Sequence, residues 1–200
     1  MLSKNLKEKI IIKKVETIDE LVEVGRIVYN RYLNAGYIEQ NKFNLWITHF
    51  QLLPEADVFI LKNGGNKILT TISILDGDNQ KLPCEYIFGD YVNNLKKSNK
   101  VAEIMCLANI GVFDMFLLLT YNVFKWCVDK FDLLLIETHP KRKCLFNRFA
   151  FSVCGNAERH FAADAPVIFM SAKPQEVVAA MELKYNKTLN LYNNEVIICL

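Results

Sequence analysis

The sequence predicts an α/β (α+β) domain, built as a mixed central sheet with a β-α-β core and flanking helices. A strand pattern at residues 101–110 is followed by a long apolar helix pattern at 112–130. A strand at 131–138 comes next and is apolar enough to be buried on both faces. The β-rich segments 57–62 and 67–75 flank Gly-Gly-Asn, which indicates a hairpin. Because a crossover makes a parallel strand pair and a hairpin an antiparallel one, the sheet is expected to be mixed.

The remaining segments supply flanking helices and edge strands. Residues 9–15 are short and β-branched, and Thr17 with Glu20 has the spacing of a capping box that starts a helix over 18–34. The other predicted elements are helices at 84–97 and 141–149, strands around 152–161 and at 166–172, a tail helix from Gln175 and a strand at 195–200. No linker or repeat divides the chain. We therefore expect one domain over 1–172, with 173–200 as a C-terminal extension of the same domain.

Composition and charge argue against several function classes. The 200 residues are 52% hydrophobic, and 24 Lys plus Arg stand against 22 Asp plus Glu, which is too balanced to predict nucleic-acid binding. The six cysteines form no CxxC pair and no metal-like spacing with the three histidines. We therefore expect no metal site, and free thiols in a reducing cytoplasm. The most apolar window, 110–128, contains Asp114, Asn122 and Lys125, which predicts a buried helix and no membrane span.

The order of elements resembles that of the GNAT acyltransferases, and short motifs sharpen the resemblance. The segments ILTTISILDGDNQKLPCEYIFGDYV, AEIMCLANI, ETHPKRKCLFNRFAFSVCG and ERHFAADAPVIFM are similar to the long-chain N-acyl amino acid synthases, relatives of the acyl-homoserine-lactone autoinducer synthases. Upstream, YNRYLNAGYI is similar to their tyrosine-rich first helix. The resemblance covers roughly residues 23–171 and implies a GNAT-like sheet. It also implies an N-acyltransferase that moves an acyl group, expected to be long, from a thioester to the amine of an amino acid or similar small acceptor.

The resemblance also implies where the thioester binds. In GNAT folds the thioester lies where two parallel strands splay apart, facing the backbone of the strand that corresponds here to 101–110. A backbone N–H in 107–110 would stabilise the oxyanion. The expected thioester and acyl site is Leu107, Ala108, Asn109, Ile110, Gly111 and Phe146.

Glu103 is the expected catalytic residue. It lies in an otherwise apolar strand and matches the glutamate of the autoinducer-synthase E-x-x-R motif, so it would hold the acceptor amine and accept its proton. A solvated strand-edge glutamate is the alternative.

Three positions depart from the family pattern. Cys106 stands where the relatives carry the motif's arginine, and Val28 stands where the first helix often has an arginine. Cys106 is expected to be a small core residue and not a nucleophile. Phe146 occupies the place of a tyrosine that protonates the leaving thiolate in many GNAT enzymes, so no phenol is available there. A thiolate leaves tolerably well near neutral pH, so slower turnover is expected.

An acyl carrier protein is the expected donor partner, with acyl-CoA as the alternative co-substrate and no tightly bound cofactor. Only Gly111 stands at the turn where acetyl-CoA-using relatives have several glycines, and Asp114 adds negative charge there, which disfavours a pyrophosphate. Lys141, Arg142 and Lys143 would meet the acidic carrier protein, although such a run is also typical of a solvated helix face.

The acceptor site is expected to include Tyr32, Tyr37, Arg159 and His160. Two other functions stay open, an acetyl-CoA-dependent N-acetyltransferase and a catalytically silent acyl-binding or partner-binding domain. The sequence leaves the acyl chain length, the acceptor and the oligomeric state open.

Overall fold

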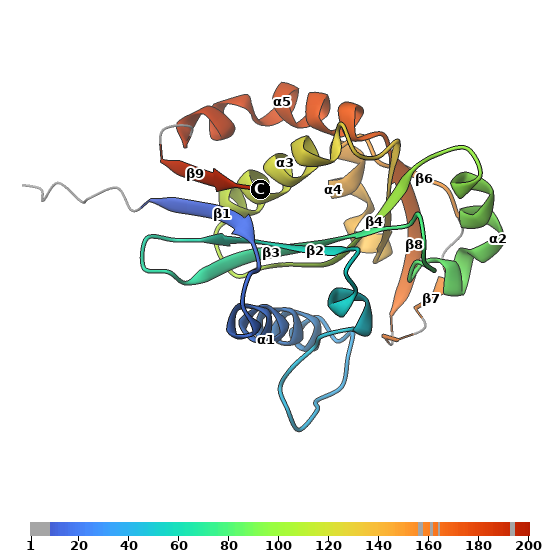
Figure 1. Ribbon diagram of the computed structural model, residues 1–200, viewed down its shortest axis with the longest axis horizontal. Coiled ribbons are helices and arrows are strands. Elements are labelled where there is room, and N and C mark those ends of the chain that lie inside the picture. The colour runs from blue at the N-terminus through green and yellow to red at the C-terminus, as the bar shows by residue number, and fades with distance from the viewer. Residues whose placement is uncertain (1–8, 156–157, 161, 164, 193–194) are drawn as a thin grey trace, which may run out of the picture.

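The computed structural model describes residues 9–155, 158–160, 162–163, 165–192 and 195–200 (Figure 1). The strands are β1 (Ile10–Lys14), β2 (Ala56–Lys62), β3 (Ile68–Asp76), β4 (Val101–Asn109), β5 (Leu133–Thr138), β6 (Ser152–Val153), β7 (Glu158–Arg159), β8 (Pro166–Ala172) and β9 (Val196–Cys199). The helices are α1 (Ile18–Asn34), η1 (His49–Leu52), α2 (Glu85–Lys96), α3 (Phe113–Cys127), η2 (Pro140–Arg142), α4 (Lys143–Arg148) and α5 (Pro174–Leu191), where η1 and η2 are 3₁₀ turns.

Within the described residues the strands form one mixed sheet in the order β6-β8-β5-β4-β3-β2-β1-β9, with β7 paired to β8. β2 and β3 pair antiparallel across the glycine-rich turn, which confirms the predicted hairpin. β4 and β5 pair parallel with α3 between them, as the crossover pattern predicted. The α/β fold class and the mixed sheet are therefore confirmed.

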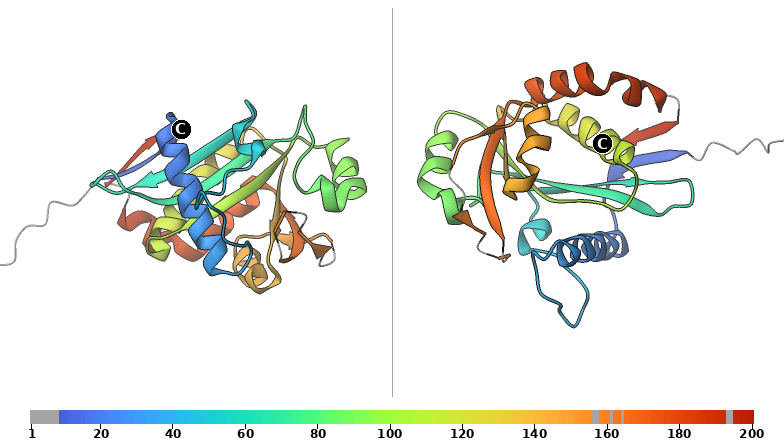
Figure 2. Two further views of the ribbon diagram at one scale, coloured as in Figure 1. Left: turned by 90° about the horizontal axis from the view of Figure 1, so that it is seen from below. Right: turned by 180° about the vertical axis from the view of Figure 1, so that it is seen from behind.

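Helices cover both faces of the sheet. α3, α4 and α5 lie on one face and α1 lies on the other (Figure 1), and the views from below and behind agree (Figure 2). The largest core lies under α3 because that helix is apolar nearly all round, with every residue from Met115 to Thr120 buried. A second core packs Val24, Ile27 and Val28 of α1 against the sheet.

The C-terminal segment packs on the rest of the chain. β9 pairs parallel to β1, and the Tyr121 hydroxyl of α3 donates a hydrogen bond to Glu182 of α5 at 2.7 Å. In this segment α5 lies against α3, and β9 is the last strand of the sheet, beside β1 (Figure 1).

The pairing of β4 changes at its midpoint. Its ladder with β5 runs from Val101 only to Ile104, opposite Ile136. On its other edge, Met105 pairs with Ser73 and Ala108 pairs with Thr71. This stretch of β4 therefore contains one residue more than the stretch of β3 opposite it. Cys106 lies in this bulge with φ of 51°, in the left-handed region. β4 thus turns away from β5 where the thioester was expected.

Two sequence predictions needed correction. The single strand around 152–161 is wrong, because two short strands replace it; Phe161 lies outside the described residues. Val153 pairs with Met170 and Glu158 pairs with Val167, so this segment advances five residues against three of β8 and one continuous ladder is not possible. The predicted helix at 141–149 begins instead as the 3₁₀ turn η2, and its α-helical part ends at Arg148.

Gly25 in α1 allows a test of how closely the loop before η1 packs on this helix. A Cβ there would lie 2.6 Å from Ile47 Cγ1 and 2.8 Å from Leu45 Cδ1, and the Trp46 amide donates to the Gly25 carbonyl at 3.1 Å. We expect Gly25→Ala to lower the free energy of unfolding by about 1–2 kcal/mol, because overpacking outweighs the helix preference for alanine. Urea unfolding measures this.

Gly89→Ala in α2 is the matched control, because no atom lies within 4 Å of a Cβ at that position. It should leave stability unchanged or raise it by up to about 1 kcal/mol. A Gly25→Ala variant as stable as the Gly89→Ala variant would contradict the close packing of the loop on α1.

Candidate active site

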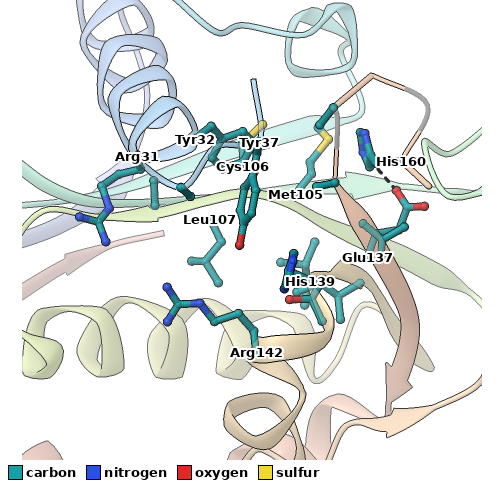
Figure 3. Close-up of a pocket in the computed structure, with 18 of the residues that line it drawn as sticks. Arg31, Tyr32, Tyr37, Met105, Cys106, Leu107, Glu137, His139, Arg142 and His160 are labelled. Carbon is teal, nitrogen blue, oxygen red and sulfur yellow. Dashed lines mark ion pairs between the residues drawn. The ribbon is translucent and has the colours of Figure 1, made fainter. Parts of the chain in front are cut away.

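A cavity of about 360 Å³ lies where β4 and β5 separate (Figure 3). Residues from both faces of the sheet line it: Tyr32 and Trp46 come from the α1 side, and Phe113, Phe116 and Phe146 come from α3 and α4. Its size is in the range of small-molecule sites. The cavity therefore has walls from both faces of the sheet, at the place where the bulge separates β4 from β5.

Apolar side chains form the wall on the α3 and α4 side. Phe146 is 4% exposed and packs edge-on against Phe151, with ring centroids 5.7 Å apart. Leu107 and Leu145 join the same wall. This part of the cavity has the chemistry of a site for an alkyl chain.

Two carboxyl groups lie at one end of the cavity. Glu103 of β4 is 1% exposed, and its Oε2 accepts a hydrogen bond from the Cys84 amide at 2.9 Å. Glu137 of β5 has a side chain 6% exposed, and its Oε1 is buried without a hydrogen-bond partner among the described residues. Glu103 was a sequence prediction, and Glu137 was missed.

Burial governs the protonation of both groups. Burial raises the pKa of Glu137 to about 7. Burial and the neighbouring Glu137 charge raise the pKa of Glu103 well above its ordinary range. Since like charges in a desolvated site disfavour double ionisation, the two carboxyls titrate as a pair.

His160 lies beside Glu137, with Nε2 3.6 Å from Glu137 Oε2 (Figure 3). Its Nδ1 accepts a hydrogen bond from the Ala162 amide at 3.0 Å, so in the neutral ring the proton is on Nε2, facing the carboxyl group. Burial lowers the pKa of His160 and favours this neutral ring.

Two arginines lie at the other end of the cavity. Arg31 comes from the last turn of α1 and Arg142 from the end of η2, and both lie on the side away from Glu137 and His160 (Figure 3). Both are exposed, and neither forms an ion pair within the described part of the chain. The cavity is therefore basic at one end and carboxyl-lined at the other.

Aromatic rings separate the two ends. Tyr37 stacks on His139, with ring centroids 5.5 Å apart and planes 14° from parallel. Tyr32 contacts both Tyr37 and Trp46. Burial raises the pKa of Tyr32, so its phenol stays protonated.

The cavity brings together most of the expected site residues. Those in its wall are Glu103, Leu107, Ala108, Asn109, Phe146, Tyr32, Tyr37, His160 and Arg142. Five others lie outside the described wall: Ile110, Gly111, Arg159, Lys141 and Lys143. Asn109 also holds the turn, since its Oδ1 accepts from the Gly111 amide at 3.1 Å.

Two missed residues carried usable signals. Glu137 is a lone carboxylate in an apolar strand, the same signal that singled out Glu103. Arg31 follows Val28 by three residues, which places both on neighbouring parts of one helix face. Val28 is fully buried, and Arg31 reaches the cavity.

Cys106 is unsuited to be a nucleophile. It is 6% exposed and packs in the core under α1, and burial raises the pKa of its thiol to about 12. Among the described residues no group of three His, Cys, Asp or Glu side chains is arranged to hold a metal ion. No described helix has the length and apolar character needed to cross a membrane.

Comparison with known proteins identifies the family. The family model described as N-acyl amino acid synthase FeeM matches residues 23–173. The structure of FeeM, an N-acyl amino acid synthase from uncultured soil microbes, superposes with a TM-score of 0.74 at 23% identity, covering 86% of this chain and 94% of that one. A comparison with curated proteins found no significant match.

Two acyl-homoserine lactone synthases share the fold. LasI has a TM-score of 0.62 at 15% identity, over 86% of this chain and 94% of its own. BjaI, a CoA-dependent enzyme solved with SAM and isopentyl-CoA, has a TM-score of 0.66 at 9% identity, over 96% of this chain and 93% of its own. The chain belongs to the N-acyl amino acid synthase FeeM family, and it is an acyltransferase with a GNAT-like fold.

Proposed function

We propose that this protein transfers a fatty acyl chain from an acyl carrier protein to the amine of an amino acid or a similar small acceptor. The observation that carries the proposal is the charge separation in the cavity between β4 and β5. Arg31 and Arg142 lie at one end and Glu137 lies at the other (Figure 3), where the buried Glu103 interacts with Glu137. A thioester with a phosphodiester handle suits the first end, and a cationic amine suits the second.

The donor half of the proposal rests on the splayed strands. Pairing of β4 with β5 ends at Ile104, so the backbone of the following residues faces the cavity without that partner strand. A thioester carbonyl lying there would meet N–H groups of residues 105–107, held by the bulge before the reaction begins. This lies earlier in β4 than the expected 107–110, because the Ile110 amide already donates to the Leu69 carbonyl at 2.8 Å. The acyl chain would extend along the wall that contains Leu107 and Phe146.

The choice of carrier protein over CoA rests on the two charged surfaces near the cavity mouth. Asp114 lies in the first turn of α3 and accepts a hydrogen bond from the Tyr192 hydroxyl at 3.4 Å, so this helix start presents negative charge to a pyrophosphate. Arg142 reaches the cavity, while Lys141 and Lys143 are exposed beside it. Arg142 would bind the single phosphodiester, and the two lysines would meet the acidic carrier protein.

Amide synthesis tests the function directly. Purified protein is incubated with medium-chain and long-chain acyl carrier protein and a pool of amino acids, and products are sought by mass spectrometry. We expect N-acyl amino acids, formed faster than from the matching acyl-CoA. Absence of any acylated product would contradict the function, and faster synthesis from acyl-CoA would contradict the donor.

Arg142→Ala tests the phosphodiester contact. A charge-assisted hydrogen bond contributes about 1.5 kcal/mol or more, so we expect KM for the acyl carrier protein to rise about tenfold with little change in kcat. With a decanoyl-pantetheine thioester, which lacks the phosphate, the variant should match the wild type. Steady-state kinetics with both donors measures the difference.

Arg148→Ala is the matched control, since Arg148 is an exposed arginine of α4 outside the cavity wall. Its KM for the carrier protein should change less than threefold. A loss in Arg142→Ala that is the same for both donors would contradict the phosphate contact.

A further inference from the structure

We propose that Glu137, held in place by His160, takes the proton from the acceptor amine, and that Glu103 is an uncharged positioning residue beside it. The inference rests on the proposed function and assigns the roles within its acceptor end. It differs from the sequence prediction, which gave the proton-accepting role to Glu103.

The first argument is which carboxyl oxygen lacks a hydrogen-bond partner. Glu137 belongs to the cavity wall, and its Oε1 is buried with no hydrogen-bond partner among the described residues. A buried unsatisfied acceptor costs about 1–3 kcal/mol, which a bound ammonium N–H would offset. Glu103 Oε2, in contrast, already accepts from the Cys84 amide at 2.9 Å.

The second argument is which carboxyl carries the negative charge. Glu103 is 1% exposed, and its pKa is raised by burial and then by the charge on Glu137. Burial raises the pKa of Glu137 to about 7. Glu103 is the more deeply buried of the two residues, so the proton that the pair shares is assigned to Glu103 near neutral pH and the negative charge to Glu137, which makes Glu137 the base.

The groups around Glu137 do not reverse this order. Among the described residues, the titratable side chains that interact with the pair are His160 after β7, Cys84 and Glu85 at the start of α2, and Cys106 of β4. The Cys84 amide lowers the pKa of Glu103, but burial has the larger effect and the net direction is upward. Burial raises the pKa of the Cys84 thiol, so the thiol stays neutral. On the neighbouring strand, β8 places the apolar Phe169 opposite Glu137.

His160 orients the base. Because its Nδ1 is occupied by the Ala162 amide, the neutral ring directs its Nε2–H toward Glu137 Oε2, 3.6 Å away. This leaves Glu137 Oε1 as the oxygen without a partner among the described residues, to which the acceptor amine would donate. His160 acts through Glu137 and is a positioning residue.

The reaction balances with these groups. Glu137 accepts one proton from the ammonium group, and the neutral amine attacks the thioester carbonyl carbon. A carbon–nitrogen bond forms and the carbon–sulfur bond breaks. The second amine proton leaves as the tetrahedral adduct collapses and is taken up by the thiolate, while Glu137 returns its proton to water.

Glu137→Gln and Glu103→Gln form a matched pair of variants. The acceptor is the amino acid that gives most product with the wild type, and the donor is decanoyl-loaded acyl carrier protein. We expect Glu137→Gln to lower kcat/KM for the acceptor by about a hundredfold or more, the usual contribution of a general base. Glu103→Gln should lose less than tenfold, because glutamine has the shape and neutrality of the protonated Glu103. Thermal melting checks that both variants fold.

The pH profile is a second readout that needs no variant at Glu137. Because the base acts when deprotonated, kcat/KM for the wild type should rise with pH through a midpoint near 7, the raised pKa of Glu137. Glu103→Gln should leave this midpoint in place. His160→Ala should move it upward, since the carboxylate loses the N–H dipole that lies 3.6 Å away, and His160→Gln, which keeps an N–H group, should restore it. A merely structural His160 would lower the rate without moving the midpoint.

Other outcomes would contradict either the division of roles between the two glutamates or the proposed function. If Glu103→Gln loses a hundredfold and Glu137→Gln does not, or if both lose equally, the division of roles is wrong while the proposed function stands. A midpoint near the ordinary carboxyl pKa of 4.5 also overturns it. A wild-type protein that forms no amide from any thioester overturns the proposed function, and the inference with it.

Discussion

β4 stays in register with β5 for four residues and then leaves it, and the site depends on that separation. Residues 101–104 pair with 133–136, after which a bulge with left-handed backbone at Cys106 turns β4 away. A left-handed non-glycine residue costs about 1–3 kcal/mol, so the surrounding structure must hold it. Packing of Cys106 in the core under α1 holds this conformation. The unpaired backbone and the cavity follow from the same distortion.

The cavity also separates charge along its length, and burial is what makes the separation useful. The arginines at one end are exposed, so they are suited to bind an anionic group that arrives from solvent, such as a phosphodiester. The carboxyls at the other end are buried, and burial brings Glu137 into the pKa range of a base that works near neutral pH. Tyr37 and His139 stack on each other in the cavity wall, between the two ends.

The sequence predicted the frame because hydrophobic periodicity is local. The hairpin, the crossover around α3 and β8 at 166–172 all follow from patterns within a few residues, and each is confirmed. The break between β6 and β7 lies in how the two strands pair with β8, which follows them in the chain, so no local pattern indicates it. The bulge at Cys106 was equally hidden, because a cysteine carries no preference for left-handed backbone.

Prediction of the site was limited in the same way. Glu103 and Phe146 were found through family resemblance, and both line the cavity. Glu137 was visible as a carboxylate in an apolar strand, but its pairing with His160 needs the register of β5 and β8. Arg31 and Arg142 lie more than a hundred residues apart, and only the fold brings them to one end.

The most direct test of the account is a crystal structure with a ketone analogue of decanoyl-phosphopantetheine, in which a methylene group replaces the sulfur. The account predicts the ketone oxygen within about 3 Å of a backbone N–H in residues 105–107, the alkyl chain along Phe146 and the phosphate at Arg142. A ligand bound outside the splayed strands, or a phosphate at the start of α3 away from Arg142, would contradict it.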